Sequence, residues 1–375
     1  MRRMSGVLCV SLVGSCLLVT VSALPAQEMT KPGPKQEKFN KLFTEWKSLL
    51  GELRTLKTEY PDAAPDRRKQ IESQYGELVK KGSAMQDRLL AAGVDAFKEA
   101  PNADKQLSQF LVEVLQWDVQ TDNYERAFEL GRALLDSKIE APNVAELTGV
   151  AAFNVMELGL AEKYLQAAKE RGTLSELAQQ CLDNLAYYRE VWPKEKATRE
   201  AEARADDLPR VLLETNKGDI EVELFENEAP NTVANFISLV EKGFYDGLTF
   251  HRVLPGFMAQ GGDPQGTGGG GPGYSIRDEV DIPNHRLHFR GSLSMAKTAM
   301  PHTGGSQFFL TFVPTRHLDG IHTVFGRVVK GMEVLAKLQR RDPDQPELPA
   351  ADTIVKARVL RKRNHEYTPQ VTAEK

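Results

Sequence analysis

The 375-residue sequence predicts a multidomain protein of α and β structure, in which an all-α N-terminal half precedes a β-rich C-terminal half. Apolar residues first recur every seven positions, and a longer helical repeat follows. Eighteen of the 29 glycines and all seven histidines lie after position 208, where alternating apolar patterns begin. Two halves of different architecture are therefore expected.

Composition argues against one class of partner. Hydrophobic residues make up 41% of the chain and charged residues 27%, and the formal net charge is −4. This balance is typical of a globular protein, and the sequence has no Lys/Arg cluster of the kind that binds nucleic acid. We therefore expect no nucleic-acid partner.

The first 26 residues have the pattern of a signal peptide. "MRRM" is basic, residues 5–23 are uncharged and apolar, and small residues offer cleavage after Ala23 or Ala26. An uncleaved membrane anchor and a lipoprotein lipidated at Cys16 are the alternatives. We expect export to a bacterial periplasm or to the extracellular space, without further attachment to a membrane.

Cysteine content is consistent with a fold that needs no disulfide. Cleavage of the signal peptide removes Cys9 and Cys16 and leaves Cys181 alone, so no internal disulfide is expected. Cys181 falls in a helical pattern and is expected to be a small buried hydrophobe.

Two amphipathic helices are expected over residues 36–100, after a polar linker at 27–35. Two apolar stripes are separated by "PDAAP" at 61–65, which predicts an antiparallel helical hairpin. Two core helices of a larger bundle are the alternative. The first stripe consists of Phe39, Leu42, Trp46, Leu49, Leu53, Leu56 and Tyr60, and the second of Ile71, Tyr75, Leu78, Met85 and Leu89.

Residues 101–191 are helical and contain a repeat. Ala127 and Ala161 occupy equivalent places in two similar helical contexts. Their separation matches the period of about 34 residues that is typical of the tetratricopeptide repeat, a helix-turn-helix unit. The region resembles this repeat, with small residues at the helix contact and the helix at 174–191 as a cap. A plain helical bundle is the alternative. We expect this region to bind a protein partner, and residues 192–208 to form a charged, solvated linker.

The C-terminal half is expected to be rich in strands. "VLLETNKGDIEVELF" alternates on either side of residues 216–219, which predicts a hairpin. Helices are expected at 229–243 and 331–340, the first beginning with Pro230 and ending before Gly243. Many strands with two helices indicate a mostly antiparallel barrel or sandwich.

Several known catalytic motifs are incomplete in this sequence. The glycine-rich stretch at 261–275 is followed by no helix and contains no G-K-[ST], so we expect a loop that runs close to a ligand or another strand. Ser306 lacks a nucleophile elbow, because Phe308 stands where glycine is required. His285 and His288 have no cysteine or ordered carboxylate beside them, so surface or hydrogen-bonding roles are expected.

A group of polar residues within apolar segments remains. An apolar pocket with a few convergent polar groups is the usual form of a binding site. Core residues with incidental polar neighbours are the alternative. The group consists of Arg252, Gln260 and Gln307, set among Phe257, Met258, Phe309 and Leu318.

Residues 209–363 resemble the cyclophilin family of peptidyl-prolyl isomerases through "FHRVLPGFMAQGGDP", "GSLSMAKT", "GGSQFFLTF" and "HLDGIHTVFG". The resemblance implies an eight-stranded antiparallel β-barrel with two helices over 209–365, followed by a polar tail at 366–375. It also implies an enzyme that accelerates rotation about X–Pro bonds in protein folding, with proline-containing polypeptides as substrates. A non-catalytic, proline-peptide-binding adaptor on a repeat-like scaffold is the alternative.

The resemblance also implies which residues form the site. Arg252 and Gln260 would be catalytic, with no metal and no cofactor. His317 stands where many members have tryptophan, a position tied to cyclosporin contact, and Lys297 stands where many have asparagine. The substrate-binding set consists of Phe257, Met258, Ala296, Lys297, Gln307, Phe309, His317, Leu318 and His322.

Overall fold

The computed structural model describes residues 32–373, which fall into two compact units. The expected signal peptide, with its two cysteines, lies outside the described residues. Within the described part of the chain, no helix is both long enough and apolar enough to cross a membrane. The first unit consists of residues 32–119, 125–152 and 159–182, and the second of residues 120–124, 153–158 and 183–373.

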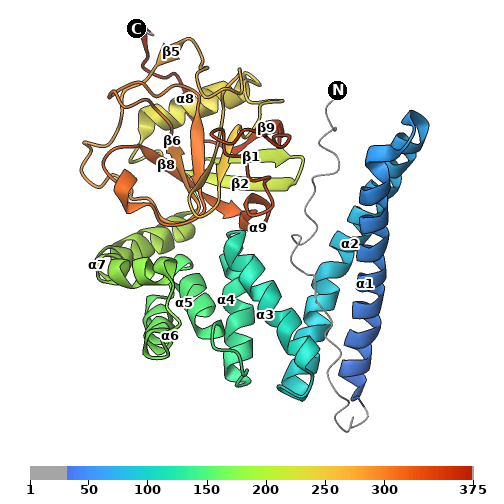
Figure 1. The fold of residues 1–375 in the computed structure, drawn as a ribbon. Helices are drawn as coiled ribbons and strands as arrows, with labels where there is room; N and C mark the ends of the chain where they lie inside the picture. The colour runs from blue at the N-terminus through green and yellow to red at the C-terminus, as the bar shows by residue number, and fades with distance from the viewer. Residues whose placement is uncertain (1–31, 374–375) are drawn as a thin grey trace. The chain divides into compact units, whose positions relative to one another are not determined.

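The first unit begins with two long antiparallel helices, α1 (Pro34–Glu59) and α2 (Pro65–Glu99), shown in blue in Figure 1. Each begins with a proline, whose missing N–H has no intrahelical partner at that position in any case. A short 3-10 turn, η2 (Tyr60–Asp62), joins them. The predicted hairpin is confirmed, because its stripes face each other. Its core contains Leu49, Leu53, Leu56, Tyr60, Ile71 and Tyr75.

Two shorter helical pairs follow with a regular offset. The spacing between Ala127 and Ala161 recurs between the ends of α3 and α5, and between both the starts and the ends of α4 and α6. A Cβ atom added at Gly131 would lie 2.1 Å from Thr148 Oγ1, so these helices approach each other closely. The helical pairs are confirmed, and their kinship to the tetratricopeptide repeat stays a prediction. Their bounds are α3 (Lys105–Gln120), α4 (Tyr124–Asp136), α5 (Val144–Asn154) and α6 (Leu158–Glu170).

Helix α7 (Glu176–Ala205) extends through most of the segment expected to be a solvated linker at 192–208. Two of its carboxylates, both in the second unit, are paired with arginines of that same unit. Glu195 Oε1 lies 2.8 Å from an Arg286 nitrogen, and Glu202 Oε2 lies 2.8 Å from an Arg327 nitrogen. The dense charge of this segment therefore reflects buried ion pairs as well as solvation.

Cys181 lies in the first part of α7 and is 5% exposed. Burial raises the pKa of its thiol to about 12. The thiolate, which is the reactive form, is therefore scarcely populated at neutral pH.

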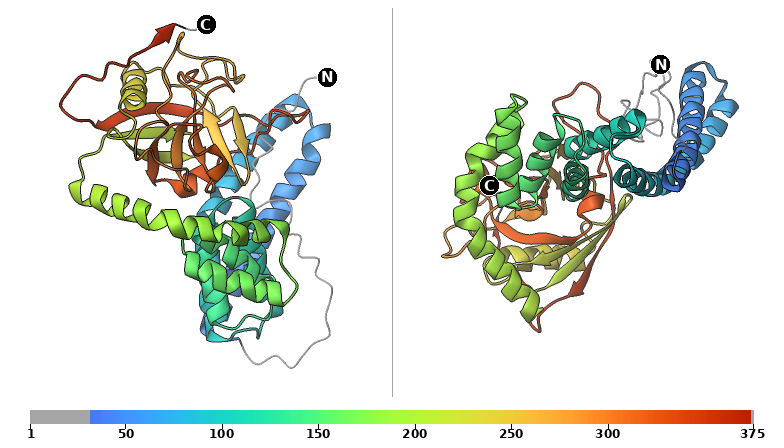
Figure 2. Two further views of the ribbon diagram at one scale, coloured as in Figure 1. Left: turned by 90° about the vertical axis from the view of Figure 1, so that its left-hand side faces the viewer. Right: turned by 90° about the horizontal axis from the view of Figure 1, so that it is seen from below.

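The second unit is built on an antiparallel sheet of eight strands within the described residues, in the order β3-β4-β7-β6-β8-β2-β1-β9. Figure 2 shows the sheet curling. Its two edges meet through a bridge between Thr249 and Thr353, beside a 2.9 Å hydrogen bond from Phe250 N to Asp352 O. The predicted eight-stranded antiparallel architecture is confirmed. The strands are β1 (Arg210–Thr215), β2 (Gly218–Leu224), β3 (Arg252–Leu254), β4 (Met258–Gly261), β6 (Ser292–Met295), β7 (Phe308–Thr311), β8 (Val324–Lys330) and β9 (Ile354–Arg361).

Two helices, α8 (Pro230–Glu241) and α9 (Met332–Leu335), accompany the sheet, as predicted. Phe236 of α8 lies at the centre of the core, with its ring centroid 5.1 to 5.5 Å from three other aromatic rings. α9 is shorter than the expected 331–340. After Leu335 the chain continues in i→i+3 turns, and Arg341 then pairs with Val253.

The residues expected to form a polar tail, 366–375, begin with an ordered contact. The Tyr367 side chain is 7% exposed, and its hydroxyl donates to a Glu226 carboxylate oxygen at 2.9 Å. Strand β10 (Thr372–Ala373) pairs with β5 (Tyr274–Ser275). Burial of the tyrosine ring and the strand pairing account for this order.

Candidate active site

The β3–β4 hairpin carries the arginine that interrupts an apolar stretch of sequence. Arg252 lies directly opposite Gln260 in the antiparallel register. The guanidinium carbon is 5.7 Å from the centroid of the Phe257 ring. Within residues 32–373 the guanidinium makes no hydrogen bond or ion pair. Its N–H donors therefore stay available to a ligand.

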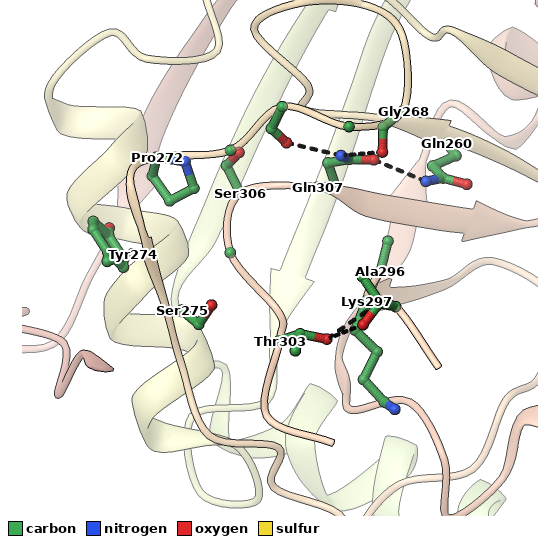
Figure 3. A pocket seen from close by; sticks show the side chains of 15 residues that line it. Gln260, Gly268, Pro272, Tyr274, Ser275, Ala296, Lys297, Thr303, Ser306 and Gln307 are labelled. Carbon is green, nitrogen blue, oxygen red and sulfur yellow. Dashed lines mark hydrogen bonds between the residues drawn. The ribbon is translucent and has the colours of Figure 1, made fainter. Parts of the chain in front are cut away.

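The two predicted glutamines are bonded to each other. Gln260 Nε2 donates to Gln307 Oε1 at 2.9 Å, and Gln307 Nε2 donates to the carbonyl oxygens of Gly268 and Gly270 at 2.9 and 2.8 Å (Figure 3). The glycine-rich loop thus fixes Gln307, and Gln307 fixes Gln260.

The glycine-rich loop is shaped around the buried carboxylate of Asp263. Backbone N–H groups of Gln265 and Thr267 donate to this carboxylate at 2.7 and 2.9 Å. Burial raises the pKa of Asp263, but these backbone donors outweigh it and hold the pKa below its usual value. A Cβ atom at Gly270 would lie 2.1 Å from Asp263 Oδ1, so the loop must pass close to it without a side chain.

The apolar side of the site contains two pairs of rings. Phe257 and His317 lie with centroids 5.6 Å apart, and Phe309 and His322 with centroids 5.5 Å apart and nearly perpendicular. Met258 is 1% exposed and lies on the same face of β4 as Gln260, because side chains of a strand alternate.

The remaining predicted residues lie at the edges of this group. Leu318 is half-buried, and its carbonyl oxygen accepts the His322 N–H at 3.2 Å. The Ala296 N–H donates to the Gln307 carbonyl oxygen at 2.9 Å. Lys297 follows in sequence, but its side chain points away from the two glutamines (Figure 3) and its Nζ lies 3.9 Å from an Asp278 oxygen. The structure therefore brings the backbone of Lys297 to the site, but not its ammonium group.

A cavity of about 270 Å³ lies beside the glutamine pair. Its walls come from the glycine-rich loop, from the segment after β6 and from the segment before β7 (Figure 3). A cavity of this volume can hold an amino-acid side chain. Residues that line the cavity include Gln260, Tyr274, Lys297, Thr298, Thr303 and Gln307.

His288 supports the site and was not singled out as a site residue from the sequence. It is fully buried, and its ring lies parallel to that of Phe309 with centroids 5.9 Å apart. Its two ring nitrogens lie 2.9 Å from Asp319 Oδ1 and from Ser294 Oγ. The expected hydrogen-bonding role is confirmed, and the position of His288 between Leu287 and Phe289 was the available signal.

Stability of the sheet unit is expected to fall as the pH drops below 6.5, the ordinary pKa of histidine. Burial lowers the pKa of His288 and of His322. Between the lowered pKa and 6.5 the unfolded chain therefore binds more protons than the folded chain, and the free energy of unfolding decreases with decreasing pH. His288→Gln is expected to flatten the dependence of Tm on pH between about 7 and 5. The same change at exposed His317 is the control. A slope unaltered by His288→Gln would contradict this account.

Other candidate chemistries find no support in the described residues. Ser306 is fully buried, and its Oγ donates to the Gly262 carbonyl oxygen at 2.7 Å, so it is not presented as a nucleophile. Within residues 32–373, no three His, Cys, Asp or Glu side chains are grouped to hold a metal ion.

Comparisons with known proteins match the sheet unit. The family model "Cyclophilin type peptidyl-prolyl cis-trans isomerase/CLD" matches residues 210–359. A peptidyl-prolyl cis-trans isomerase of Synechococcus elongatus is 53% identical over 137 residues, which are 36% of this chain and 92% of that protein. Peptidyl-prolyl cis-trans isomerase B of Bacillus subtilis is 55% identical over 132 residues, which are 35% of this chain and 90% of that protein. A crystal structure of a cyclophilin-type isomerase from Cryptosporidium parvum, 35% identical, covers 42% of this chain and 99% of its own, with a TM-score of 0.38.

Proposed function

This chain belongs to the cyclophilin-type peptidyl-prolyl cis-trans isomerases, and we propose that Arg252 and Gln260 perform its catalysis in an exported protein whose helical unit binds other proteins. The substrates are proline-containing polypeptides. The alternative of a non-catalytic adaptor has no feature of the site in its favour.

The reaction places a specific demand on the protein. An X–Pro peptide bond rotates over a barrier of about 18–20 kcal/mol, in tens to hundreds of seconds without catalysis. Rotation removes the amide resonance and leaves a lone pair on the prolyl nitrogen. A donor directed at that lone pair stabilises the twisted state more than either planar isomer, which is the condition for catalysis. The rotation makes and breaks no covalent bond.

Arg252 supplies such a donor. Arginine stays charged at every physiological pH and has several rigid N–H groups. The observation that carries the proposal is the position of this guanidinium, beside the Phe257 ring and opposite Gln260, with donors that no described residue uses. The hydrogen bond to Gln307 holds the side-chain amide of Gln260 in a fixed orientation beside the arginine.

Binding in the pocket supplies the rest of the rate enhancement. An acceleration of about 10⁵-fold requires roughly 7 kcal/mol of preference for the twisted state. One well-placed donor in a partly dry site contributes about 3–4 kcal/mol. The proline ring, held by Phe257, Met258, Phe309 and Leu318, is then fixed in the orientation that the donor needs, and positioning accounts for the remainder.

The experiment that tests the proposal is a protease-coupled isomerisation assay on an Ala-Pro peptide with the whole purified chain. We expect clear acceleration over the uncatalysed rate. An unfolded protein without proline, added as a competitor, should slow isomerisation of a protein client but not of the peptide, because only the protein client would engage the helical unit. A chain without isomerase activity would refute the assignment of the site. Equal competition for both substrates would refute the role of the helices.

Export rests on the N-terminal pattern alone. The basic start, the apolar segment and the small residues before Leu24 and Gln27 support cleavage by a signal peptidase. Mass spectrometry of the protein from the cells that produce it should find a mature chain that begins at Leu24 or Gln27. An intact N-terminus would refute cleavage, and a lipid on Cys16 would favour the lipoprotein alternative.

A further inference from the structure

We propose that Asp122, which is remote in sequence from the sheet, is a positioning residue for the isomerase reaction. It fixes the turn of the β3–β4 hairpin and through it the Phe257 ring. The inference rests on the place that the proposed function gives to Phe257 in the proline pocket.

Asp122 lies in the segment Gln120–Tyr124, which belongs to the same compact unit as the sheet. The residue is 1% exposed. Its Oδ1 accepts the backbone N–H of Gly256 at 2.9 Å, and its Oδ2 accepts an N–H of Arg340 at 2.7 Å. The carboxylate therefore joins the tip of the hairpin to an arginine that follows α9.

The segment that carries Asp122 is itself held in place. Arg340 also donates to the Thr121 carbonyl oxygen at 2.6 Å, and Arg290 donates to the Asp122 carbonyl oxygen at 2.7 Å. Asp122 has a φ of 63°, a left-handed conformation that aspartate tolerates better than most residues. Arg340 and Arg290 thus hold the backbone of Thr121 and Asp122 in place.

Gly256 is the point at which this contact reaches the pocket. It precedes Phe257 directly and lies in the exposed turn that links β3 to β4. The Phe257 ring contacts both the Arg252 guanidinium and the His317 ring, at centroid distances of 5.7 and 5.6 Å. A shift of the Gly256 backbone therefore moves one wall of the pocket relative to the catalytic donor.

A carboxylate suits this task better than a neutral group. Hydrogen bonds to an ionised acceptor are shorter and roughly twice as strong as neutral ones. The same carboxylate also pairs with Arg340, whose side chain is mostly buried, with 22% exposure. The turn is consequently anchored to a carboxylate that an ion pair with Arg340 holds in place.

The test is a double-mutant cycle between Asp122→Ala and Phe257→Ala in the whole chain. Asp122→Ala is expected to lower kcat/KM for an Ala-Pro peptide about tenfold, mainly through KM, because small misplacements in a site have effects of this size. In the Phe257→Ala background the same change should cost less than about twofold, since no ring remains to be positioned. The backbone amide proton of Gly256 should also move to lower frequency in the NMR spectrum of Asp122→Ala.

Asp118→Asn is the matched control. Asp118 is fully buried and pairs with Arg126, but it belongs to the first unit and not to the unit that carries the hairpin. It should lower stability while the Gly256 resonance and KM stay unchanged. If Asp122→Ala fails to fold, Asp122→Asn replaces it in the cycle. It keeps an acceptor for Gly256, and is expected to cost a few-fold in kcat/KM, again only when Phe257 is present.

Two results would overturn the inference alone. The first is a loss from Asp122→Ala that is equal in both backgrounds, which would indicate general destabilisation. The second is an Asp122→Ala enzyme with normal KM beside a damaged Phe257→Ala enzyme. A Phe257→Ala enzyme with normal activity would instead overturn the proposed pocket, and with it the inference.

Discussion

Arg252→Ala is expected to lower kcat/KM for an Ala-Pro peptide by about 10²- to 10³-fold, the usual cost of removing one donor that stabilises a transition state. The fold should persist. The side chain is half-buried, and the contact that it loses is the one with the Phe257 ring, which is worth only about 1 kcal/mol. Circular dichroism and Tm show whether the fold persists. The isomerisation assay measures the loss of activity.

Arg277→Ala provides the control for this experiment. Arg277 belongs to the same unit, is 71% exposed and pairs with Asp281 at 3.1 Å, so its removal should leave activity unchanged. Arg252→Lys keeps the charge but not the planar fork, and should recover only a small part of the activity. Activity near that of the unaltered chain in a folded Arg252→Ala protein would remove the arginine from the mechanism.

Glu195→Ala is expected to lower the free energy of unfolding of the sheet unit by about 3 kcal/mol, because it leaves a buried guanidinium without its main partner. The Arg286 side chain is 5% exposed, and it binds both oxygens of Glu195, at 2.8 and 3.1 Å. Arg199 donates to the same carboxylate at 2.7 Å. For a unit of this size the expected decrease in Tm is roughly 6–12 °C.

Glu200→Ala is the matched control, since Glu200 lies on the same helix but is exposed. It should change Tm by no more than about 2 °C, as is usual for surface substitutions. Differential scanning calorimetry measures both variants in the whole chain. If Glu195→Ala and Glu200→Ala unfold at the same temperature, the ion pairs of α7 do not stabilise the sheet unit. If these ion pairs do stabilise the unit, a catalytic fragment should include α7 from residue 183 onward and should not begin at 209.

The helices and strands were largely predictable, because they follow from periodic patterns. The heptad stripe of Phe39 and Trp46 placed α1, and the spacing of Ala127 and Ala161 matched the offset between α4 and α6. Alternation around residues 216–219 gave the β1–β2 hairpin. Each of these signals is a regular spacing along the chain, so the sequence alone carries it.

The site residues were predicted through the motifs that contain them. The buried residues that hold the site and its sheet in place were not predicted. The contacts Arg252–Phe257 and Gln260–Gln307 lie inside segments that resemble a known family. Arg286, which pairs with Glu195, is 91 residues away from it in the chain, and Gly256, which donates to Asp122, is 134 residues away from it. A charge looks the same in sequence whether it is solvated or buried against a distant arginine, so these pairs had no local signal.

The buried thiol of Cys181 has a practical consequence for attaching a fluorescent label to the protein. With its pKa near 12, this sulfur will not compete with an exposed cysteine for a maleimide dye at neutral pH. Gln265 contributes a backbone N–H group to the loop around Asp263, and its side chain is exposed. A fluorophore on a cysteine at position 265 would therefore report on the loop beside the active site from a chain with no other reactive thiol among the described residues.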